Sequence, residues 1–219
     1  MTLETADIAA LLATWIRGWA LVRGLPAPIA LPDEAWRVDV GQADQLVRYV
    51  IPDSKLALVT RLAGELHQPA TWLKICAAPD EIAPLLPPPW ALSDLRWFMR
   101  IALAAPADPA VPAGFTLSLI EAGPVTSAII RTGAGQPAAG GNLIMLGRQA
   151  VFDQIGTETA FRRLGLGRLV MQSLADHAVV RGADEGLLVA TETGKQLYLA
   201  LDWQVLSPYT SAFIPLPTA

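Results

Sequence analysis

The sequence predicts a mixed α/β fold in which helices flank a mostly antiparallel, twisted sheet. Two observations favour this class. Four segments of strand character follow one another in the second half of the chain with Gly/Pro turns between them, and a helical segment and a short apolar strand come next. The 219 residues are 53% hydrophobic and only 16% charged, which is enough apolar material for a sizeable core and argues against disorder.

The first half of the chain reads as an α+β region. Apolar residues over about 5–23 recur at spacings of three and four, which predicts an opening helix. Beyond it, the patterns predict strands in AWRVDVG, LVRYVIP, TWLKICA and LRWFMRIAL, and helices in SKLALVTRLAGEL and DEIAPLL. The Ala/Pro-rich segment 104–114 is nearly uncharged and is typical of an extended linker. We therefore expect an N-terminal α+β domain over 1–105 and a second domain over 112–219.

The second half of the chain alternates strands and turns before it becomes helical. Strands are expected in FTLSLIEA, VTSAIIRT, GNLIMLG and RQAVFDQIGT, and their close spacing predicts an antiparallel meander. A helix then extends to about Val180, with Gly182 as its cap. GLLVAT predicts a short apolar strand, GKQLYLAL a short helix, and WQVLSPYTSAFIPL either two strands or one bent strand.

Composition argues against several classes of protein. The formal net charge is −4 and no basic block occurs, so a nucleic-acid partner is not expected. The single cysteine, Cys76, cannot form an internal disulfide and reads as a buried thiol, and no Cys/His cluster suggests a metal site. The N-terminus lacks the basic lead of a signal peptide, and no uncharged apolar run approaches the ~18 residues of a membrane span. We expect a cytoplasmic protein without a membrane partner.

The segment TETAFRRLGLGRLVM, residues 157–171, carries the strongest chemical signal. A dinucleotide-binding loop needs G-x-G-x-x-G, but the third glycine position counted from Gly165 is Val170. A Walker loop needs Gly-Lys-Ser/Thr, but the Gly-Lys pair at 194–195 is followed by Gln196. Two interpretations remain, a plain glycine turn before a helix or a phosphate-binding loop of another kind.

The context of the two glycines favours a phosphate ligand. The pattern Arg162-x-x-Gly165-x-Gly167 lies between a predicted strand and a predicted helix, whose first turn offers unpaired backbone N–H groups to an anion. Glycines let the backbone approach a ligand closely, and an arginine adds positive charge. The helix behind the loop carries an apolar stripe that should hold it against a sheet, formed by Leu166, Val170, Leu174 and Ala178.

The loop RRLGLG resembles the R/Q-x-x-G-x-G/A signature of the GNAT (GCN5-related N-acetyltransferase) superfamily, in which it cradles the pyrophosphate of acetyl-CoA. The resemblance covers 140–207 closely and 112–219 loosely. AVFDQIGT is similar to the family's fourth strand, and GKQLYLALDWQVL is similar to its short helix and the turn usually written L-Y-x-x-x-G-F. This likeness implies the acyl-CoA N-acyltransferase fold.

The chain departs from the family pattern at three places. Asp202 stands where that turn usually has glycine, and Thr191 stands where an asparagine is common. The family's helices between its first two strands are not evident, because FTLSLIEA runs almost directly into VTSAIIRT. We expect the N-terminal half to supply the acceptor wall instead. Its own strand–helix–strand pattern suggests a degenerate second copy of the fold, or part of one.

The resemblance implies roles for particular residues. Tyr198 matches the tyrosine that protonates the leaving thiolate in the family, and the unperturbed phenol pKa is near 10. Asp153, on the strand before the loop, or Glu158, just beyond it, is the expected general base; His177 has no role. The resemblance also implies that acetyl-CoA, the co-substrate, is anchored by the loop backbone and that its pantetheine arm pairs with the end of the preceding strand. The residues implied at the strand end and in the loop are Ile155, Gly156, Thr157, Arg162, Arg163, Leu164, Gly165, Leu166, Gly167 and Arg168. No metal is expected.

These features lead us to expect an N-acetyltransferase that transfers acetyl from acetyl-CoA to the amine of a small molecule or peptide by direct attack. Two alternatives stay open. One is a non-catalytic acyl-CoA-binding protein of the same fold, motivated by the unassigned base and by Asp202. The other is an acyltransferase for longer acyl chains, with room supplied by the Trp-rich N-terminal half. Because similar proteins are often dimers, a homodimer is an expected assembly.

Overall fold

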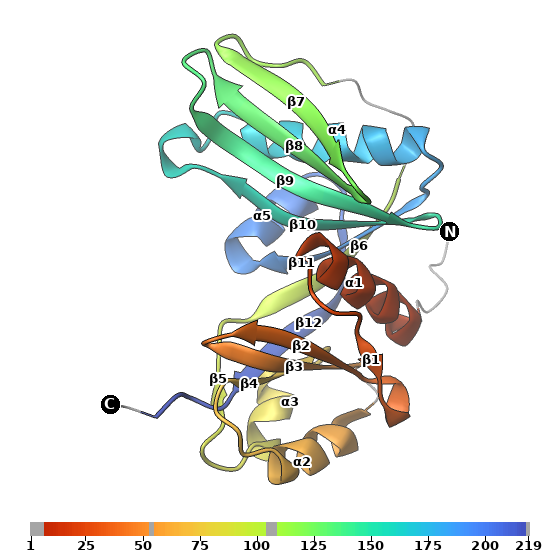
Figure 1. The fold of residues 1–219 in the computed structure, drawn as a ribbon, viewed down its shortest axis with the longest axis vertical. Helices are drawn as coiled ribbons and strands as arrows, with labels where there is room; N and C mark the ends of the chain where they lie inside the picture. Colours follow the sequence, from red (N-terminus) through yellow and green to blue (C-terminus); the bar gives the residue numbers. More distant parts are fainter. Residues whose placement is uncertain (1–6, 53–54, 104–108, 218–219) are drawn as a thin grey trace. The chain divides into compact units, whose positions relative to one another are not determined.

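A computed structural model describes residues 7–52, 55–103 and 109–217 (Figure 1). The chain divides into two compact units that are not contiguous in sequence. We call the first unit Met1–Met99, Val189–Lys195 and Val205–Ala219, and the second unit Arg100–Leu188 and Gln196–Gln204. The C-terminal segment therefore belongs with the N-terminal half. The domain boundary expected in the linker stays a prediction, since 104–108 lies outside the described residues.

The first unit is built on a mostly antiparallel sheet of strand order β1-β2-β3-β4-β12, in which only β3 and β4 run parallel. The short strand β5 pairs with β12. The elements are α1 (Ile8–Val22), β1 (Ile29–Ala30), β2 (Trp36–Gln42), β3 (Gln45–Ile51), α2 (Leu56–Glu65), β4 (Thr71–Ile75), α3 (Pro79–Ile82), β5 (Ala91–Leu92) and β12 (Gln204–Phe213). Short 3-10 helices occupy Pro32–Glu34 and Ala83–Leu85.

Apolar side chains on α2 and on one face of this sheet form a core. Val59 of α2 is fully buried together with Ile51, Leu73 and Ile75 of the strands. The opposite face holds α1, whose Trp15 ring packs edge-on against Tyr209 of β12 at a centroid distance of 5.5 Å. The expected opening helix is confirmed over Ile8–Val22, while its first expected residues, 5 and 6, lie outside the described part of the chain.

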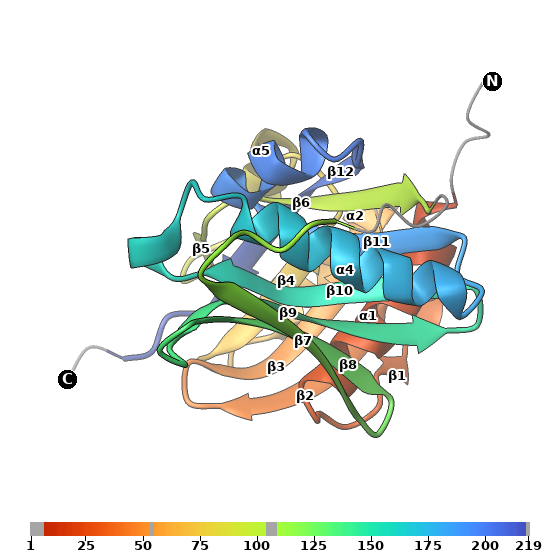
Figure 2. The same cartoon turned by 90° about the horizontal axis from the view of Figure 1, so that it is seen from above.

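The second unit contains the meander predicted from the sequence. Its strands pair antiparallel in the order β7-β8-β9-β10, and β11 pairs parallel with β10. The helix α4 covers one face of this sheet (Figure 1, Figure 2). The elements are β7 (Phe115–Ala122), β8 (Val125–Thr132), β9 (Pro137–Leu146), β10 (Gln149–Thr157), α4 (Leu166–Val180), β11 (Glu185–Thr191) and α5 (Glu192–Leu199). Residues of β6 (Arg96–Ala102), β11 and α5 occur in both units.

Turns and caps follow the expected chemistry. The turn between β7 and β8 has no intervening helix and uses Gly123 at φ +57°, as expected. The helix α4 ends with Gly182 at φ +90°, where the N–H of Ala183 donates to the Ala178 carbonyl in the pattern of a Schellman cap. The last segment is one strand, β12, which resolves the alternative left open by the sequence. Within the described ranges, no helix has both the length and the apolarity needed to cross a membrane.

Candidate functional site

The end of β10 is irregular on one side. Its antiparallel register with β9 shifts between Asp153 and Gly156, and Gln154 adopts a positive φ of 57°. Such a bulge bends the strand and disrupts the regular ladder. The amide of Asn142 on β9 donates to the Gln154 side chain at 2.6 Å, so the bulged residue is held from the neighbouring strand.

The other side of β10 is paired with β11 over a short distance only. The parallel register joins Gln149–Val151 to residues 185–187 and goes no further. From Phe152 onward the backbone on this side of β10 is not part of that ladder. An extended chain could therefore pair with Ile155–Thr157, as β-strand addition requires.

The glycine loop lies directly behind this strand end. Gly165 is the N-cap of α4 with a left-handed φ of 78°, and no side chain caps the helix there. Arg163 also has a positive φ, 65°. The N–H groups of Leu166, Gly167 and Arg168 form the first helical turn, where intrahelical partners are absent by geometry. The loop thus presents uncapped backbone donors, which is the arrangement that phosphates bind.

The helix behind the loop is held rigidly. The predicted apolar stripe is confirmed, because Leu166, Val170, Leu174 and Ala178 are all at most 1% exposed. A Cβ at Gly167 would lie 3.1 Å from Leu197 Cδ2 of α5, so this position is tightly packed.

Arginine side chains link the loop to its surroundings. Arg162 Nε donates to the Thr157 carbonyl at 3.4 Å, and Arg168 Nη2 donates to the Ala200 carbonyl at 3.2 Å. Arg162, Arg163 and Leu164 are exposed, so their side chains reach solvent. The guanidinium groups of Arg162 and Arg163 remain accessible to an anion in the loop.

The turn after α5 explains the Asp202 departure. Asp202 has φ +64°, which is the left-handed conformation that a glycine would adopt without strain. The N–H groups of Asp202 and Trp203 donate to the carbonyls of Leu199 and Tyr198, which forms a Schellman turn. The aspartate therefore holds the left-handed conformation that a glycine favours at this position. Thr191, the other departure, accepts the N–H of Gly194 at 3.0 Å and caps α5.

Tyr198 is held in an apolar environment at the end of α5. It is 7% exposed, and its ring lies 5.9 Å from that of Trp203, which in turn packs edge-on against Phe152 of β10. Burial raises the pKa of the Tyr198 hydroxyl well above its usual value, and the negative charge of Asp153 raises it further. The phenol therefore keeps its proton across the physiological pH range.

The candidate bases differ in their surroundings. Asp153 is half-buried on β10 and acts electrostatically on Tyr198, so these two predicted residues are brought together. Glu158 is exposed, and its backbone N–H donates to the Ala138 carbonyl. His177 contacts Thr126 and Arg181, and burial followed by the Arg181 charge lowers its pKa. It is thus engaged in packing α4, and its expected lack of a catalytic role stays a prediction.

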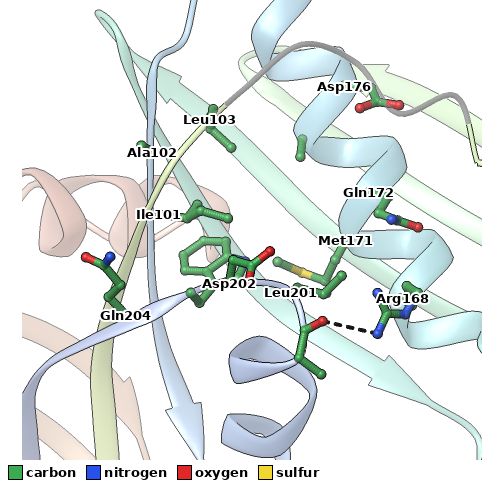
Figure 3. A pocket seen from close by; sticks show the side chains of 13 residues that line it. Ile101, Ala102, Leu103, Arg168, Met171, Gln172, Asp176, Leu201, Asp202 and Gln204 are labelled. Atoms are coloured by element: carbon green, nitrogen blue, oxygen red, sulfur yellow. Dashed lines mark hydrogen bonds between the residues drawn. The ribbon is translucent and has the colours of Figure 1, made fainter. Parts of the chain in front are cut away.

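A pocket of about 510 Å³ lies along α4, within the second unit (Figure 3). Apolar side chains such as Met171 and Leu201 line it together with the polar groups Arg168, Asp176 and Asp202. Figure 3 shows Arg168 reaching across to the Ala200 carbonyl at the edge of this pocket. Of the site residues predicted from sequence, the lining includes only Arg168. Helical spacing from Arg168 could have indicated the other lining residues of α4, which are Met171, Gln172, Ala175 and Asp176, but not those of the other elements.

No group of three or more His, Cys, Asp or Glu side chains that could hold a metal occurs among the residues that the structure covers. The candidates for the chemistry of the site are the uncapped loop, the end of β10 that β11 leaves unpaired, the buried Tyr198 and the carboxylate of Asp153.

The strand order, the bulged strand and the glycine loop define the acyl-CoA N-acyltransferase fold, which is the fold of the GCN5-related N-acetyltransferases. A structure of this type from Kribbella flavida matches 97% of both chains with a TM-score of 0.64 at 17% identity. Another from Sphaerobacter thermophilus matches 98% of this chain and 95% of its own, with a TM-score of 0.61 at 15% identity.

A GCN5-related N-acetyltransferase-like protein from Streptococcus suis also matches, with a TM-score of 0.60 at 14% identity, over 95% of this chain and 97% of its own. No protein-family model and no curated protein matches the sequence. At these identities the likeness establishes the fold, which spans both units. The resemblance recognised in the RRLGLG loop is thereby confirmed at the level of fold.

Proposed function

We propose that the protein is an acetyl-CoA-dependent N-acetyltransferase that acts on an amine. The observation that carries this proposal is the uncapped first turn of α4, with Gly165 at φ +78°, directly behind the end of β10 that β11 leaves unpaired. One feature fits a diphosphate and the other fits an extended amide-bearing arm. Acetyl-CoA carries both groups, in that order.

The anchoring role falls to the backbone rather than to side chains. The backbone N–H groups from Arg163 to Arg168 would donate hydrogen bonds to the pyrophosphate oxygens, and the Arg162 guanidinium lies nearby. The peptide groups of Ile155, Gly156 and Thr157 would bind the pantetheine amides as an added strand. When bound, acetyl-CoA supplies an activated thioester carbonyl; every other requirement falls to the chain.

Proton transfer would involve Tyr198 and a carboxylate. Attack by an amine forms the amide bond and breaks the carbon–sulfur bond, so one proton leaves the amine and one reaches the thiolate. The buried phenol of Tyr198 stays protonated and can donate to the thiolate. Asp153 would accept the proton that converts the ammonium to the attacking amine, directly or through water, and Glu158 is the alternative base at the exposed end of the strand. The second proton, which the nitrogen releases as the amide forms, would replace the one that Tyr198 gives to the thiolate.

The test separates catalysis from binding. Calorimetry with acetyl-CoA and with desulfo-CoA measures anchoring, and release of free thiol across a panel of amines measures turnover. We expect saturable acetyl-CoA binding and amine-dependent thiol release. Tight binding with no turnover on any amine would support the non-catalytic acyl-CoA-binding protein instead, and turnover with only longer acyl-CoAs would support the longer-chain acyltransferase. The absence of binding would overturn the proposal. A homodimer stays a prediction, to be checked by light scattering.

A further inference from the structure

Lys74 occupies an unusual place on the sheet of the first unit. The strand registers align Trp36 with Val50, Val50 with Lys74, and Lys74 with Ser211, so these residues form one row across four strands. Because Leu73 and Ile75 point into the α2 core, alternation directs Lys74 to the opposite face, on which α1 packs. A lysine at the centre of a sheet is therefore enclosed from several sides.

Within the described part of the chain, the charged groups that act on Lys74 include no carboxylate. The side chain belongs to a residue only 6% exposed, its Nζ donates to Ser211 Oγ at 2.9 Å, and it lies 4.1 Å from the centre of the Trp72 ring. The charged groups that act on it are Arg48 of β3 and Arg96 of β6, and both are cations. Burial and then these two arginines lower the pKa of Lys74 to about 6.

A second buried group points to a missing hydrogen-bond acceptor. Tyr209 of β12 is 1% exposed, and its hydroxyl has no hydrogen-bond partner. It lies on the same strand and face as Ser211, two residues away, and the same arginines, Arg48 and Arg96, act on it electrostatically. Buried polar groups normally find partners, so an unpaired phenol beside two guanidinium groups calls for an explanation.

The remaining unpaired groups of this region are also donors. Trp36 Nε1 and Gln45 Nε2 are buried without a hydrogen-bond partner, and the Gln45 amide orientation is fixed because its oxygen accepts from Arg48. Neither group can accept a hydrogen bond through these atoms. Trp36 shares the face of Lys74, and Gln45 reaches the cluster through Arg48, so this region is rich in donors and cations.

We propose that Arg48, Lys74, Arg96 and Tyr209 bind a small anion through carboxylate or phosphate oxygens. Such oxygens accept hydrogen bonds and carry the negative charge that the cluster lacks around Lys74. Trp72 and Phe213, stacked at 4.8 Å next to Lys74, are partly exposed, so this side of the cluster borders solvent. This site goes beyond the acetyltransfer proposal, because it needs neither the glycine loop nor acyl-CoA.

Anion binding at this site is linked to protonation. An anion next to Lys74 favours its charged form, so binding above about pH 6 takes up a proton. The groups that act electrostatically on Lys74 or Tyr209 are Arg48 on β3, Arg96 on β6 and Cys76 beyond β4. The helix α1 adds Arg17 and Arg23, whose guanidinium groups lie over Trp36 and Trp19, and its acidic N-cap, Asp7.

The chain offers a direct measurement, because it contains only three lysines, Lys55, Lys74 and Lys195. In the full-length protein labelled with 13C at lysine Cε, a Lys74→Met variant assigns the Lys74 signal. Inorganic phosphate and acetate are titrated separately, with chloride at equal ionic strength as the control. We expect one of them to raise the Lys74 pKa by about one unit or more. Each unit of this shift corresponds to about tenfold tighter binding of the anion to the protein with a charged Lys74 than to the protein with a neutral one.

Matched variants make the outcome decisive. Calorimetry in two buffers of different ionisation enthalpy should show proton uptake for the wild type and for Lys55→Met, which replaces a half-buried lysine that pairs with Glu34 instead. Tyr209→Phe keeps the packing and should weaken binding at least about fivefold. A Lys74 pKa that moves with neither phosphate nor acetate, or binding that Tyr209→Phe leaves unchanged, would overturn the site. Binding to phosphate alone or acetate alone identifies the class of anion.

Discussion

The two units contain the same local order of elements but differ in how far their two parallel strands pair. The first unit has an antiparallel hairpin of β2 and β3, followed by α2 and β4. The second unit has an antiparallel hairpin of β9 and β10, followed by α4 and β11. In both cases the two strands that flank the helix run parallel. This recurrence supports the expectation of a degenerate second copy, which stays a prediction.

The difference lies in how far the parallel pairing extends. Val47–Ile51 pairs with Thr71–Ile75 along its whole length, and the N–H of Cys76 continues the ladder to the Ile51 carbonyl. The equivalent pairing of β10 stops at Val151. The connection into α2, Pro-Asp-Ser-Lys at 52–55, contains no glycine. Because β3 and β4 pair along their whole length and no glycine loop follows β3, no backbone groups remain between these strands to pair with an extended ligand. The comparison therefore favours the second unit for the proposed acyl-CoA site.

Replacing Gly165 should have the largest effect. A Gly165→Trp substitution fills the loop and forces a side chain into φ +78°, so we expect acetyl-CoA affinity to fall at least about 100-fold, or ~3 kcal/mol. The matched control is Gly135→Trp, which has a similar φ of 83° and equally open space for a Cβ, but lies in the turn before β9. Calorimetry on both variants distinguishes local strain from loss of the anchor. Retained affinity in Gly165→Trp would contradict the assignment of the loop.

Tyr198→Phe tests the chemistry of the second unit without touching its anchor. Loss of a proton donor should lower kcat by about 100-fold or more, while acetyl-CoA affinity changes little. Because its pKa is raised, Tyr198 stays protonated at alkaline pH, so wild-type kcat should not fall below pH 10 through this group. Tyr49→Phe on β3 serves as the control from the closed unit. A variant with normal kcat would remove Tyr198 from the mechanism.

The stability of the first unit should depend on pH through Lys74. Its pKa is about 6 in the folded chain and near 10.4 when unfolded, so the unfolded state binds more protons between these values. The free energy of unfolding should therefore rise with pH across that window, by up to about 1.4 kcal/mol per unit. Urea unfolding at pH 7 and pH 9 should show this rise in the wild type and a smaller one in Lys74→Met. An equal rise in both would contradict the burial of an uncharged lysine.

The smallest expected effect concerns the turn after α5. Asp202 occupies a left-handed conformation that costs a non-glycine residue about 1 kcal/mol, so Asp202→Gly should raise stability by roughly 0.5–1 kcal/mol after the added freedom of the unfolded chain is included. Asp184→Gly, outside such a conformation, gives the control. Thermal unfolding measures both variants. A destabilised Asp202→Gly protein would mean that the carboxylate itself stabilises the turn.

Local sequence determined several features of this protein. The spacing of apolar residues predicted α1 and α4, and the glycine positions predicted the loop and the cap at Gly182. The alternation in the second half predicted the meander. Each of these features depends on neighbours within a few residues. The R-x-x-G-x-G pattern likewise predicted a helix start with uncapped donors. Tyr198 and Asp153, separated by 45 positions in the sequence, were matched to their roles only through family resemblance.

Tertiary structure decided the rest. The pairing of β10 with β11 ends at Val151, just before the register shift of β10 against β9, and β12 joins the first unit by pairing with β4, which lies more than a hundred residues earlier in the chain. The burial of Lys74 and Tyr209 among arginines depends on four strands meeting in register. Strand partners are set by long-range packing, which a local pattern does not encode. The sequence therefore pointed to the ligand-binding loop, and only the folded sheets separated an open strand end from a closed one.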